Sequence, residues 1–371
     1  MKQSGNSLFL QLMRVALGNA EEMGIALSDE EWVRMMDVVA KQGVTGIAFS
    51  GVEKLPKAQM PPLEVIMDWS AVVDYTEREN RRLNDVNVKV CRMIERDGKR
   101  ACIIKGASIG VMYPEPLRRS VGDVDVWMAG GYKAVSEYVM GKYPDAKGDS
   151  YGHHFVAEVD DVSVEVHFLP AELYNICHNR YLRKYYRTIE EMPWNGRARL
   201  ENGDIVVPEP QVTFVIVVVH LFHHWAFEGI GMKQVVDCYW LLKYVDGIQG
   251  KDTNGKGADE IRAEVMAFFR KVGIGNFVAA LMYVLQQLGL EKTQMLCVPD
   301  AKLGERLLDD IFATGIVSAD ELAMGKYGHE GKLHKFFRRL RRVMRMMPMA
   351  PSEMPWVMLK NIWGWMLGRT K

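Results

Sequence analysis

The chain has 371 residues, of which 48% are hydrophobic and 25% are charged. This is the composition of an ordinary soluble globular protein, with room for two domains or for one domain with a large helical extension. The 47 basic residues equal the 47 acidic ones, so the mean charge excludes nothing and indicates no polyanionic partner.

Cysteine usage and the apolar runs narrow the class of protein. The cysteines stand singly and form no CxxC pair: Cys91, Cys102, Cys177, Cys238 and Cys297. This pattern argues against a disulfide framework or a cysteine-rich zinc site and indicates a cytoplasmic protein. Gln11 and Arg14 interrupt the N-terminal apolar stretch, which favours an amphipathic helix over a signal peptide. The most apolar run, 212–222, is much shorter than the roughly 20 residues of a membrane span, so it predicts a buried helix.

Residues 1–98 predict an N-terminal helical region. Leucines and methionines between residues 8 and 17 indicate a first helix, and 31–42 a second. A long third helix is expected over 67–97, with Gly98 at its end, because glycine commonly follows a helix.

Residues 99–178 predict an α/β (α+β) core with a small mixed sheet. A short apolar run at 101–104 is typical of a buried strand, 121–128 alternates between polar and apolar residues, and 132–142 suits a helix. Two further strands, 154–159 and 162–168, flank Asp160 and Asp161, which are the residues of a hairpin turn.

Residues 179–330 predict a C-terminal helical region, followed by a basic amphipathic tail over 331–371. Helical spacing is found over 212–226, 232–244, 258–272 and 277–288. One extended piece is expected at 204–207 and one flexible loop at 247–257.

Three acidic residues of the core carry the candidate chemistry. Asp123 and Asp125 are two positions apart on a predicted strand, so both carboxylates lie on one face. Glu165 stands between two valines on a later strand and points away from them. If the two strands are neighbours, the three carboxylates converge and can hold Mg²⁺, or two metal ions for in-line phosphoryl transfer. A lone Asp-x-Asp is more often a solvated strand edge, so the order of the surrounding elements matters.

The residues upstream of the acids fit a phosphate. After the strand at 101–104, Gly106 allows backbone amides to approach an anion, and the start of a helix favours negative charge. Lys105 precedes it, and the Ser108 hydroxyl can add a donor. Arg118 and Arg119 lie shortly before the first Asp, where a guanidinium could contact a triphosphate.

Two segments, 105–128 and 153–170, together resemble the uncharacterised bacterial nucleotidyltransferases of the DNA polymerase beta-type superfamily. The positions that match its motif are Gly106, Ser108, Asp123, Asp125 and Glu165, and the resemblance extends over residues 80–245. It implies transfer of a nucleoside monophosphate from an NTP to an acceptor, with Mg²⁺ or Mn²⁺ and release of pyrophosphate. Ala107 separates the glycine from the serine, and the serine lies further from Asp123 than is usual, so the contact to phosphate is expected to differ.

A second cluster follows the core. His220, His223 and His224 are spaced so that at least two share a helix face, and Lys233 and Asp237 follow one turn apart on the next helix. The resemblance implies that this region forms the opposite wall of the cleft, with His223, His224 and Lys233 near the nucleotide. Partly buried structural histidines are an alternative, as is a zinc site, although no carboxylate or cysteine completes one nearby. Lys233 could equally pair with Asp237.

Three other histidines lie close to the acids in sequence. His153 and His154 precede the hairpin and either face the cleft or lie exposed at the strand end. His167 shares a face with Glu165 and is expected to support it.

The tail contains a basic helix over 332–345, with seven Lys or Arg and no acid. Such a helix can lie on an anionic membrane or bind nucleic acid, but it more often packs its apolar face on its own domain. Two other possibilities stay open: a catalytically silent nucleotide-binding or regulatory module with the same fold, and a peripheral membrane enzyme acting on a glycan or lipid-linked acceptor.

Overall fold

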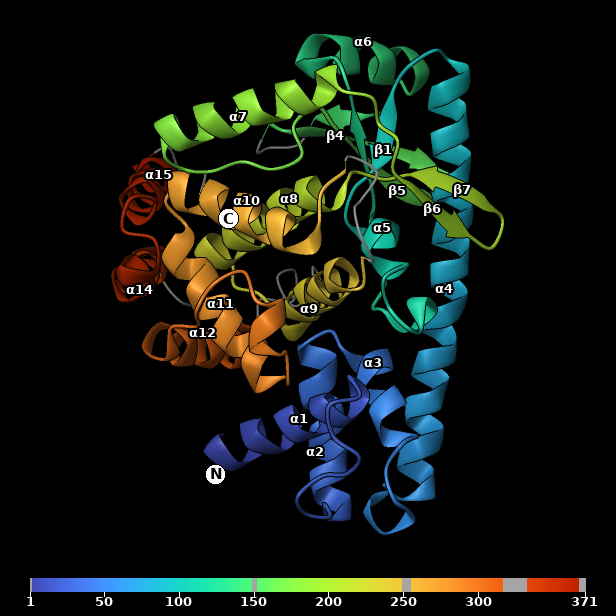
Figure 1. The fold of residues 1–371 in the computed structure, drawn as a ribbon, viewed down its shortest axis with the longest axis vertical. Coiled ribbons are helices and arrows are strands. Elements are labelled where there is room, and N and C mark those ends of the chain that lie inside the picture. The colour runs from blue at the N-terminus through green and yellow to red at the C-terminus, as the bar shows by residue number, and fades with distance from the viewer. Residues whose placement is uncertain (1, 149–151, 249–254, 316–331, 367–371) are drawn as a thin grey trace.

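In the computed structural model, residues 2–148, 152–248, 255–315 and 332–366 are described. Four N-terminal helices precede the sheet: α1 (Lys2–Ala16), α2 (Asp29–Lys41), α3 (Thr45–Val52) and α4 (Leu63–Arg96). Figure 1 shows the first three gathered at one end of the molecule, with α4 running along its whole side up to the sheet.

The first and last residues of these helices follow from local chemistry. Ser28 and Glu31 form a reciprocal capping box, so α2 begins before the predicted residue 31. Helix α3 was not predicted, because every residue from Gly46 to Val52 is buried and no polar face marks the helical period. Gly98 has φ 68° and ends α4, as predicted.

The core is a five-stranded mixed sheet in the order β1-β2-β5-β4-β3, which confirms the predicted fold class. Its strands are β1 (Ala101–Ile103), β2 (Val124–Met128), β3 (Lys147–Gly148), β4 (His154–Val159) and β5 (Val162–His167). β2 and β5 are parallel, and the other neighbouring pairs are antiparallel. α5 (Gly106–Gly110) follows β1, and α6 (Gly131–Lys142) follows β2.

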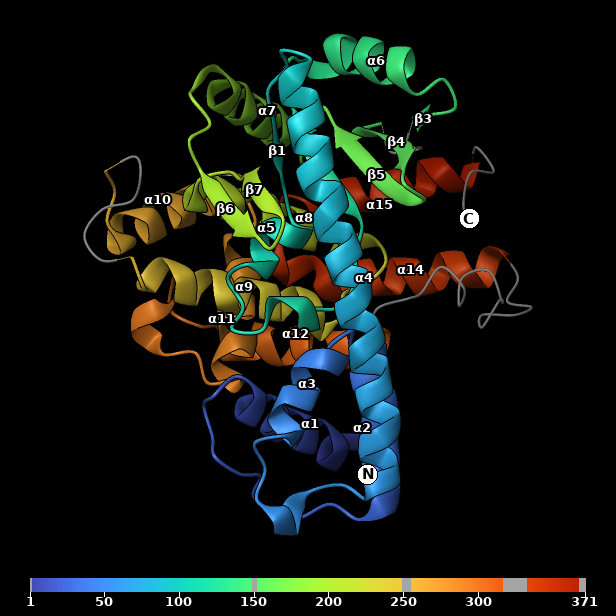
Figure 2. The same cartoon turned by 90° about the vertical axis from the view of Figure 1, so that its right-hand side faces the viewer.

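The predicted turn between β4 and β5 is confirmed. Asp160 and Asp161 have φ of 52° and 58°, the positive values that a tight two-residue hairpin turn requires and that Asp tolerates better than most residues. Lys89 of α4 contacts the Asp160 carboxylate at 2.6 Å, which ties the turn to the long helix (Figure 2).

The remaining described chain is mostly helical, with one two-stranded sheet. The sequence predicted a single extended piece at 204–207, whereas β6 (Arg197–Leu200) and β7 (Gly203–Val206) form a hairpin. The helices are α7 (Ile176–Glu191), α8 (Pro210–Phe227), α9 (Met232–Asp246), α10 (Ala258–Lys271), α11 (Gly275–Gln287), α12 (Ala301–Thr314), α14 (Lys332–Met346) and α15 (Met354–Met366). Short 3-10 turns lie at Lys57–Gln59, Pro116–Arg118, Lys292–Gln294 and Met347–Met349.

Two hydrophobic cores hold these elements together. One joins the N-terminal helices to α8–α12, and the other joins α4 and α6 to one face of the large sheet. Within the described residues, α8 is the one helix that is long and apolar enough to cross a membrane, but 78% of that stretch is buried inside the protein. A buried core helix can be as long and as apolar as a membrane span, and α8 is such a helix, as predicted from the apolar run at 212–222.

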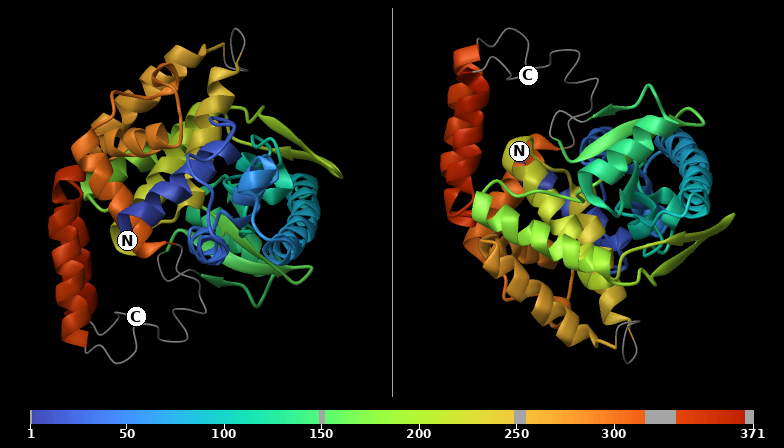
Figure 3. Two further views of the ribbon diagram at one scale, coloured as in Figure 1. Left: turned by 90° about the horizontal axis from the view of Figure 1, so that it is seen from below. Right: turned by 90° about the horizontal axis from the view of Figure 1, so that it is seen from above.

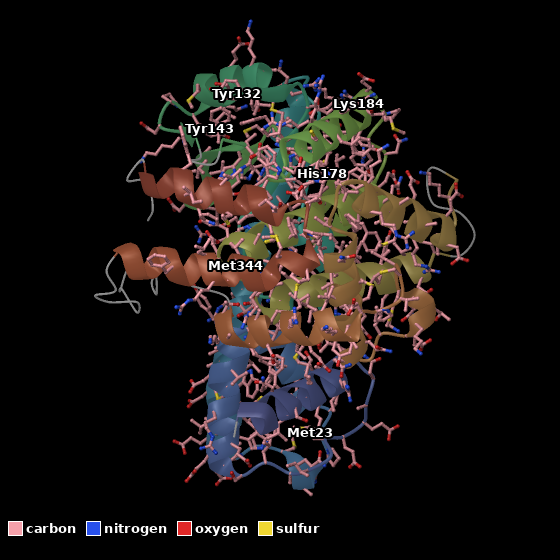
Figure 4. All side chains as sticks on the ribbon, turned by 90° about the vertical axis from the view of Figure 1, so that its left-hand side faces the viewer. Met23, Tyr132, Tyr143, His178, Lys184 and Met344 are labelled. Carbon is pink, nitrogen blue, oxygen red and sulfur yellow. The ribbon has the colours of Figure 1, made fainter. Side chains whose placement is uncertain are left out.

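The helices α14 and α15 contact each other, and Figure 3 shows this C-terminal segment in red along one edge of the molecule. Figure 4 shows Met344 on α14, and it shows His178 of α7 close to α15. His178 Nδ1 lies 2.6 Å from Glu353 Oε1, just before α15. Arg342 and Arg345 of α14 contact the buried carboxylate of Asp310 on α12 at 2.9 and 3.1 Å. The described part of the basic tail therefore packs on its own chain.

Candidate active site

Two acidic residues face each other across neighbouring parallel strands. Asp125 of β2 is the register partner of Glu165 of β5, so their side chains lie on the same face of the sheet. The flanking valines face the core beneath the sheet. Asp123 directly precedes β2, which begins at Val124 rather than at the predicted residue 121. All three acids line one cavity.

His167 lies between the paired acids. Its Nε2 is 3.0 Å from Asp125 Oδ1 and 3.2 Å from Glu165 Oε2, and its side chain is fully buried. The ligand atoms of the three residues lie within 4.8 Å of one another, close enough to share one cation. Asp123 is not part of this compact group, although it lines the same cavity.

The charges of the acids act on one another. Burial raises the pKa of Asp123, and the nearby carboxylates of Asp125 and Glu165 raise it further. Burial also opposes ionisation of Asp125, but Lys105 and His167 outweigh it and hold the pKa of that carboxyl below its usual value. Lys105 Nζ is 2.5 Å from Asp125 Oδ1. The site therefore concentrates negative charge and already balances part of it with its own cations.

A strained turn joins β1 to α5. Lys105 has φ 58° and Gly106 has φ 42°, and a Cβ at Gly106 would lie 3.2 Å from the carbonyl oxygen of Asp123. The glycine thus lets the turn approach the acid strand closely. α5 has only five residues, so its helix dipole is small and its N-terminus attracts an anion less than expected.

Ser108 lies differently from the prediction. Its side chain is buried, and its Oγ donates to the carbonyl of Lys105 at 2.8 Å. It is absent from the cavity lining, whereas Lys105 and Gly106 are part of it. Ser108 therefore supports the turn instead of pointing its hydroxyl towards a ligand in the cavity.

The two arginines before the acids have separate partners. Arg119 is buried, and its Nε and Nη2 donate to both oxygens of Asp237 at 2.7 and 2.9 Å. Arg118 instead forms ion pairs with Glu53, Glu77 and Glu115 and does not line the cavity. The expected contact of Arg118 with a triphosphate is therefore wrong for this arrangement, while Arg119 borders the cavity with its guanidinium already paired.

Helices α8 and α9 provide the facing wall. His220, His223, His224 and Lys233 line the same cavity as the acids, as the resemblance implied for this region. Lys233 Nζ donates to the carbonyl of Val121 at 2.9 Å, next to the acid strand. The alternative that Lys233 pairs with Asp237 is not found, because Asp237 pairs with Arg119 and accepts a hydrogen bond from the Tyr113 hydroxyl at 2.6 Å.

The histidines of α8 are held by aromatic and ionic contacts. The His223 ring stacks on Tyr174 at 4.8 Å, and His224 Nδ1 lies 3.2 Å from Glu228 Oε2. Burial lowers the pKa of His223 to about 3. No group of metal-competent side chains within the described residues includes a histidine of α8. The zinc alternative at this helix is therefore not supported. The contact of Tyr174 with His223 was not predicted, because no spacing in the sequence indicates it.

The cavity has a volume of about 530 Å³. This is within the usual range of small-molecule sites, roughly 300–1,000 Å³. One wall of the cavity carries the carboxylates, and three basic residues also line the cavity: Lys105, Arg119 and Lys233. The arrangement can hold a cation on the acids and anionic groups of a ligand on the basic side chains.

Comparison with known proteins identifies the family of the chain. A solved structure described as an antigenic nucleotidyltransferase-like protein from Paracoccidioides brasiliensis is similar to 60% of this chain and 96% of its own, at 11% identity and a TM-score of 0.34, which is too low to support an argument. No curated protein matches the sequence. Residues 28–270, well over half of the chain, match the family described as "Uncharacterised nucleotidyltransferase", a longer stretch than the 80–245 resemblance. Because this match covers more than half of the chain, the chain belongs to that nucleotidyltransferase family.

Proposed function

We propose that this protein is a metal-dependent nucleotidyltransferase that transfers a nucleoside monophosphate from an NTP to an acceptor and releases pyrophosphate. The register pair Asp125 and Glu165 carries the proposal, because it fixes two carboxylates side by side at one wall of the cavity. Asp123 adds a third acid at the entry of β2. The family supports nucleotidyl transfer in general.

The residues fit a divalent metal ion. Mg²⁺ and Mn²⁺ prefer carboxylate oxygens. Burial raises the pKa of Asp123, and the neighbouring carboxylates of Asp125 and Glu165 raise it further, so a bound cation would stabilise the ionised acids. Asp125 and Glu165 would hold the ion, with Asp123 available for the same ion or a second one. When bound, the metal would offset the charge on the phosphates and favour ionisation of the acceptor.

The chain's own residues would bind and orient the substrate. Lys105, Arg119 and Lys233 are the cations of the cavity and suit the triphosphate. In the transfer, the acceptor oxygen forms a bond to the α-phosphorus while the bond from that phosphorus to the pyrophosphate oxygen breaks. One of the carboxylates accepts the acceptor's proton. Burial of Lys105 next to Asp125 keeps the lysine at the acid wall, within reach of an anionic ligand.

Nucleotide binding and turnover test the proposal separately. Purified protein is melted with each of four NTPs and Mg²⁺ or Mn²⁺, and pyrophosphate release and self-modification are followed in parallel. A ligand at 100 times its Kd stabilises the fold by about 2.7 kcal/mol, which is roughly 5 °C for a chain of this size. Asp125→Asn and Glu165→Gln should lose this shift. Glu158→Gln, which removes an exposed carboxylate from the same hairpin, should keep it.

Each outcome has a defined meaning. A metal-dependent shift with pyrophosphate release supports the enzyme. A shift without release from any NTP, with acceptor candidates present, favours the catalytically silent nucleotide-binding module. If no NTP raises the melting temperature, or if Asp125→Asn keeps the full shift, the proposed site is wrong.

A further inference from the structure

Three imidazoles gather beside the acid pair, and the proposed transfer uses none of them directly. His154 of β4 and His167 of β5 are register partners, so their side chains share one face of the hairpin. His153 directly precedes β4, and its ring centroid lies 4.6 Å from that of His154 and 5.4 Å from that of His167. One ligand nitrogen of each residue lies within 4.8 Å of the other two.

The surroundings of His167 are those of a metal ligand. Metal-binding histidines usually donate the N–H of their second ring nitrogen to a carboxylate or carbonyl. Nε2 of His167 already contacts Asp125 and Glu165 at 3.0 and 3.2 Å. Its Nδ1 is buried and has no hydrogen-bond partner among the residues that the structure describes. With the hydrogen on Nε2, Nδ1 keeps a lone pair that accepts no hydrogen bond from the described residues and is available to a metal ion.

We infer that His153, His154 and His167 bind a transition-metal ion of the zinc and cobalt class. Imidazole nitrogen suits such ions, whereas Mg²⁺ prefers oxygen ligands. The nearby carboxylates supply charge balance, because His154 Nε2 lies 3.6 Å from Glu165 Oε1. The His153 and His154 side chains line the cavity, so an ion can enter from it. The site borders the proposed nucleotide site and holds whether or not the protein transfers nucleotides.

The test measures metal binding without nucleotide. Full-length protein, stripped with a chelator, is titrated with Co²⁺ and with Zn²⁺ in the presence of excess Mg²⁺, and binding is followed by calorimetry and by the visible spectrum of Co²⁺. We expect one tight equivalent that excess Mg²⁺ does not displace. His154→Ala and His153→Ala should each weaken binding by at least about tenfold. His178→Gln, which removes an imidazole that does not line the cavity, should leave the affinity unchanged.

A measurement on the unaltered protein guards against variants that fail to fold. X-ray absorption at the zinc edge of the loaded wild-type protein should show scattering from several imidazole rings. Scattering from oxygen ligands alone, no uptake in excess Mg²⁺, or equal affinity in folded His153→Ala and His154→Ala variants would overturn the inference. The NTP-dependent shift with Mg²⁺ is a separate readout, so either proposal can fail while the other stands.

Discussion

The buried pair of Arg119 and Asp237 gives a sharp test of how the core is fixed to the facing helices. Both side chains are almost inaccessible, and two hydrogen bonds join the guanidinium of Arg119 to the carboxylate of Asp237. Asp237→Asn keeps the size of the side chain but removes its charge. The guanidinium of Arg119 then stays buried without a counter-charge, which is the costly way to break such a pair.

The expected loss follows from that geometry. Removing one partner of a buried pair costs about 3–5 kcal/mol of unfolding free energy. At about 2 °C per kcal/mol, the melting temperature should fall by roughly 6–10 °C, measured by circular dichroism at neutral pH. Glu53→Gln is the matched control, because Glu53 pairs with Arg118 near the surface, where such pairs contribute about 0–1 kcal/mol.

Two further results would check the reasoning. Burial opposes ionisation of Asp237, but Arg119 outweighs it and lowers the pKa of Asp237, so the pair stabilises the fold at neutral pH and loses that contribution only as the pH falls through the lowered pKa. Replacing the whole network by Arg119→Met, Asp237→Leu and Tyr113→Phe should restore most of the stability, since neither charge of the pair is then left buried alone. A melting temperature of Asp237→Asn within about 2 °C of wild type would refute the argument.

Four more outcomes can be measured. Burial lowers the pKa of Lys233 to about 8, whereas in the unfolded chain it is near 10.4. Between these two pH values the unfolded chain binds one more proton than the folded chain, so the melting temperature of wild type relative to Lys233→Met should rise with pH. A difference that falls with pH would contradict this. Gly106→Ala should lower stability by about 1–3 kcal/mol and weaken the NTP-dependent shift, because the residue has φ 42° and its new methyl meets the Asp123 carbonyl. Asp161→Gly should raise the free energy of unfolding by about 0.5–1 kcal/mol. Glycine removes the cost of the left-handed conformation, about 1–2 kcal/mol, but it loses more chain entropy on folding. An unchanged melting temperature would show that Asp fits the turn equally well. Wild-type protein should not sediment with anionic vesicles at physiological salt. Asp310→Ala frees two arginines of α14 and should sediment more than wild type. Equal sedimentation of the two proteins would show that the basic helix is already exposed in wild type.

The sequence predicted well the elements whose pattern is local. The Asp160–Asp161 turn fixes the β4–β5 hairpin, and alternation of apolar residues identifies β5 with Glu165 on the face opposite its valines. The pairing of β2 with β5 could only be assumed, because no local signal in the sequence shows which strands are neighbours.

What could not be predicted depends on partners distant in the chain. Asp237 pairs with Arg119 rather than with Lys233, because burial of the arginine requires a counter-charge that only the folded chain supplies. Ser108 was expected to point towards phosphate, but its hydroxyl is satisfied by the carbonyl of Lys105 within the turn. The helix α3 was missed, because its complete burial removes the polar face on which periodicity depends.

The long helix α4 has a practical consequence for dividing the chain into fragments. Its first half packs into the N-terminal core through Val65, Trp69 and Val73, while Val86, Val90 and Ile94 of its second half belong to the core beneath the sheet. A recombinant fragment that begins at residue 99, the expected start of the core, would expose this apolar face of the sheet to water and should aggregate. A fragment that begins near residue 62 keeps the covering helix and is the better starting point for expressing the region that holds the candidate active site.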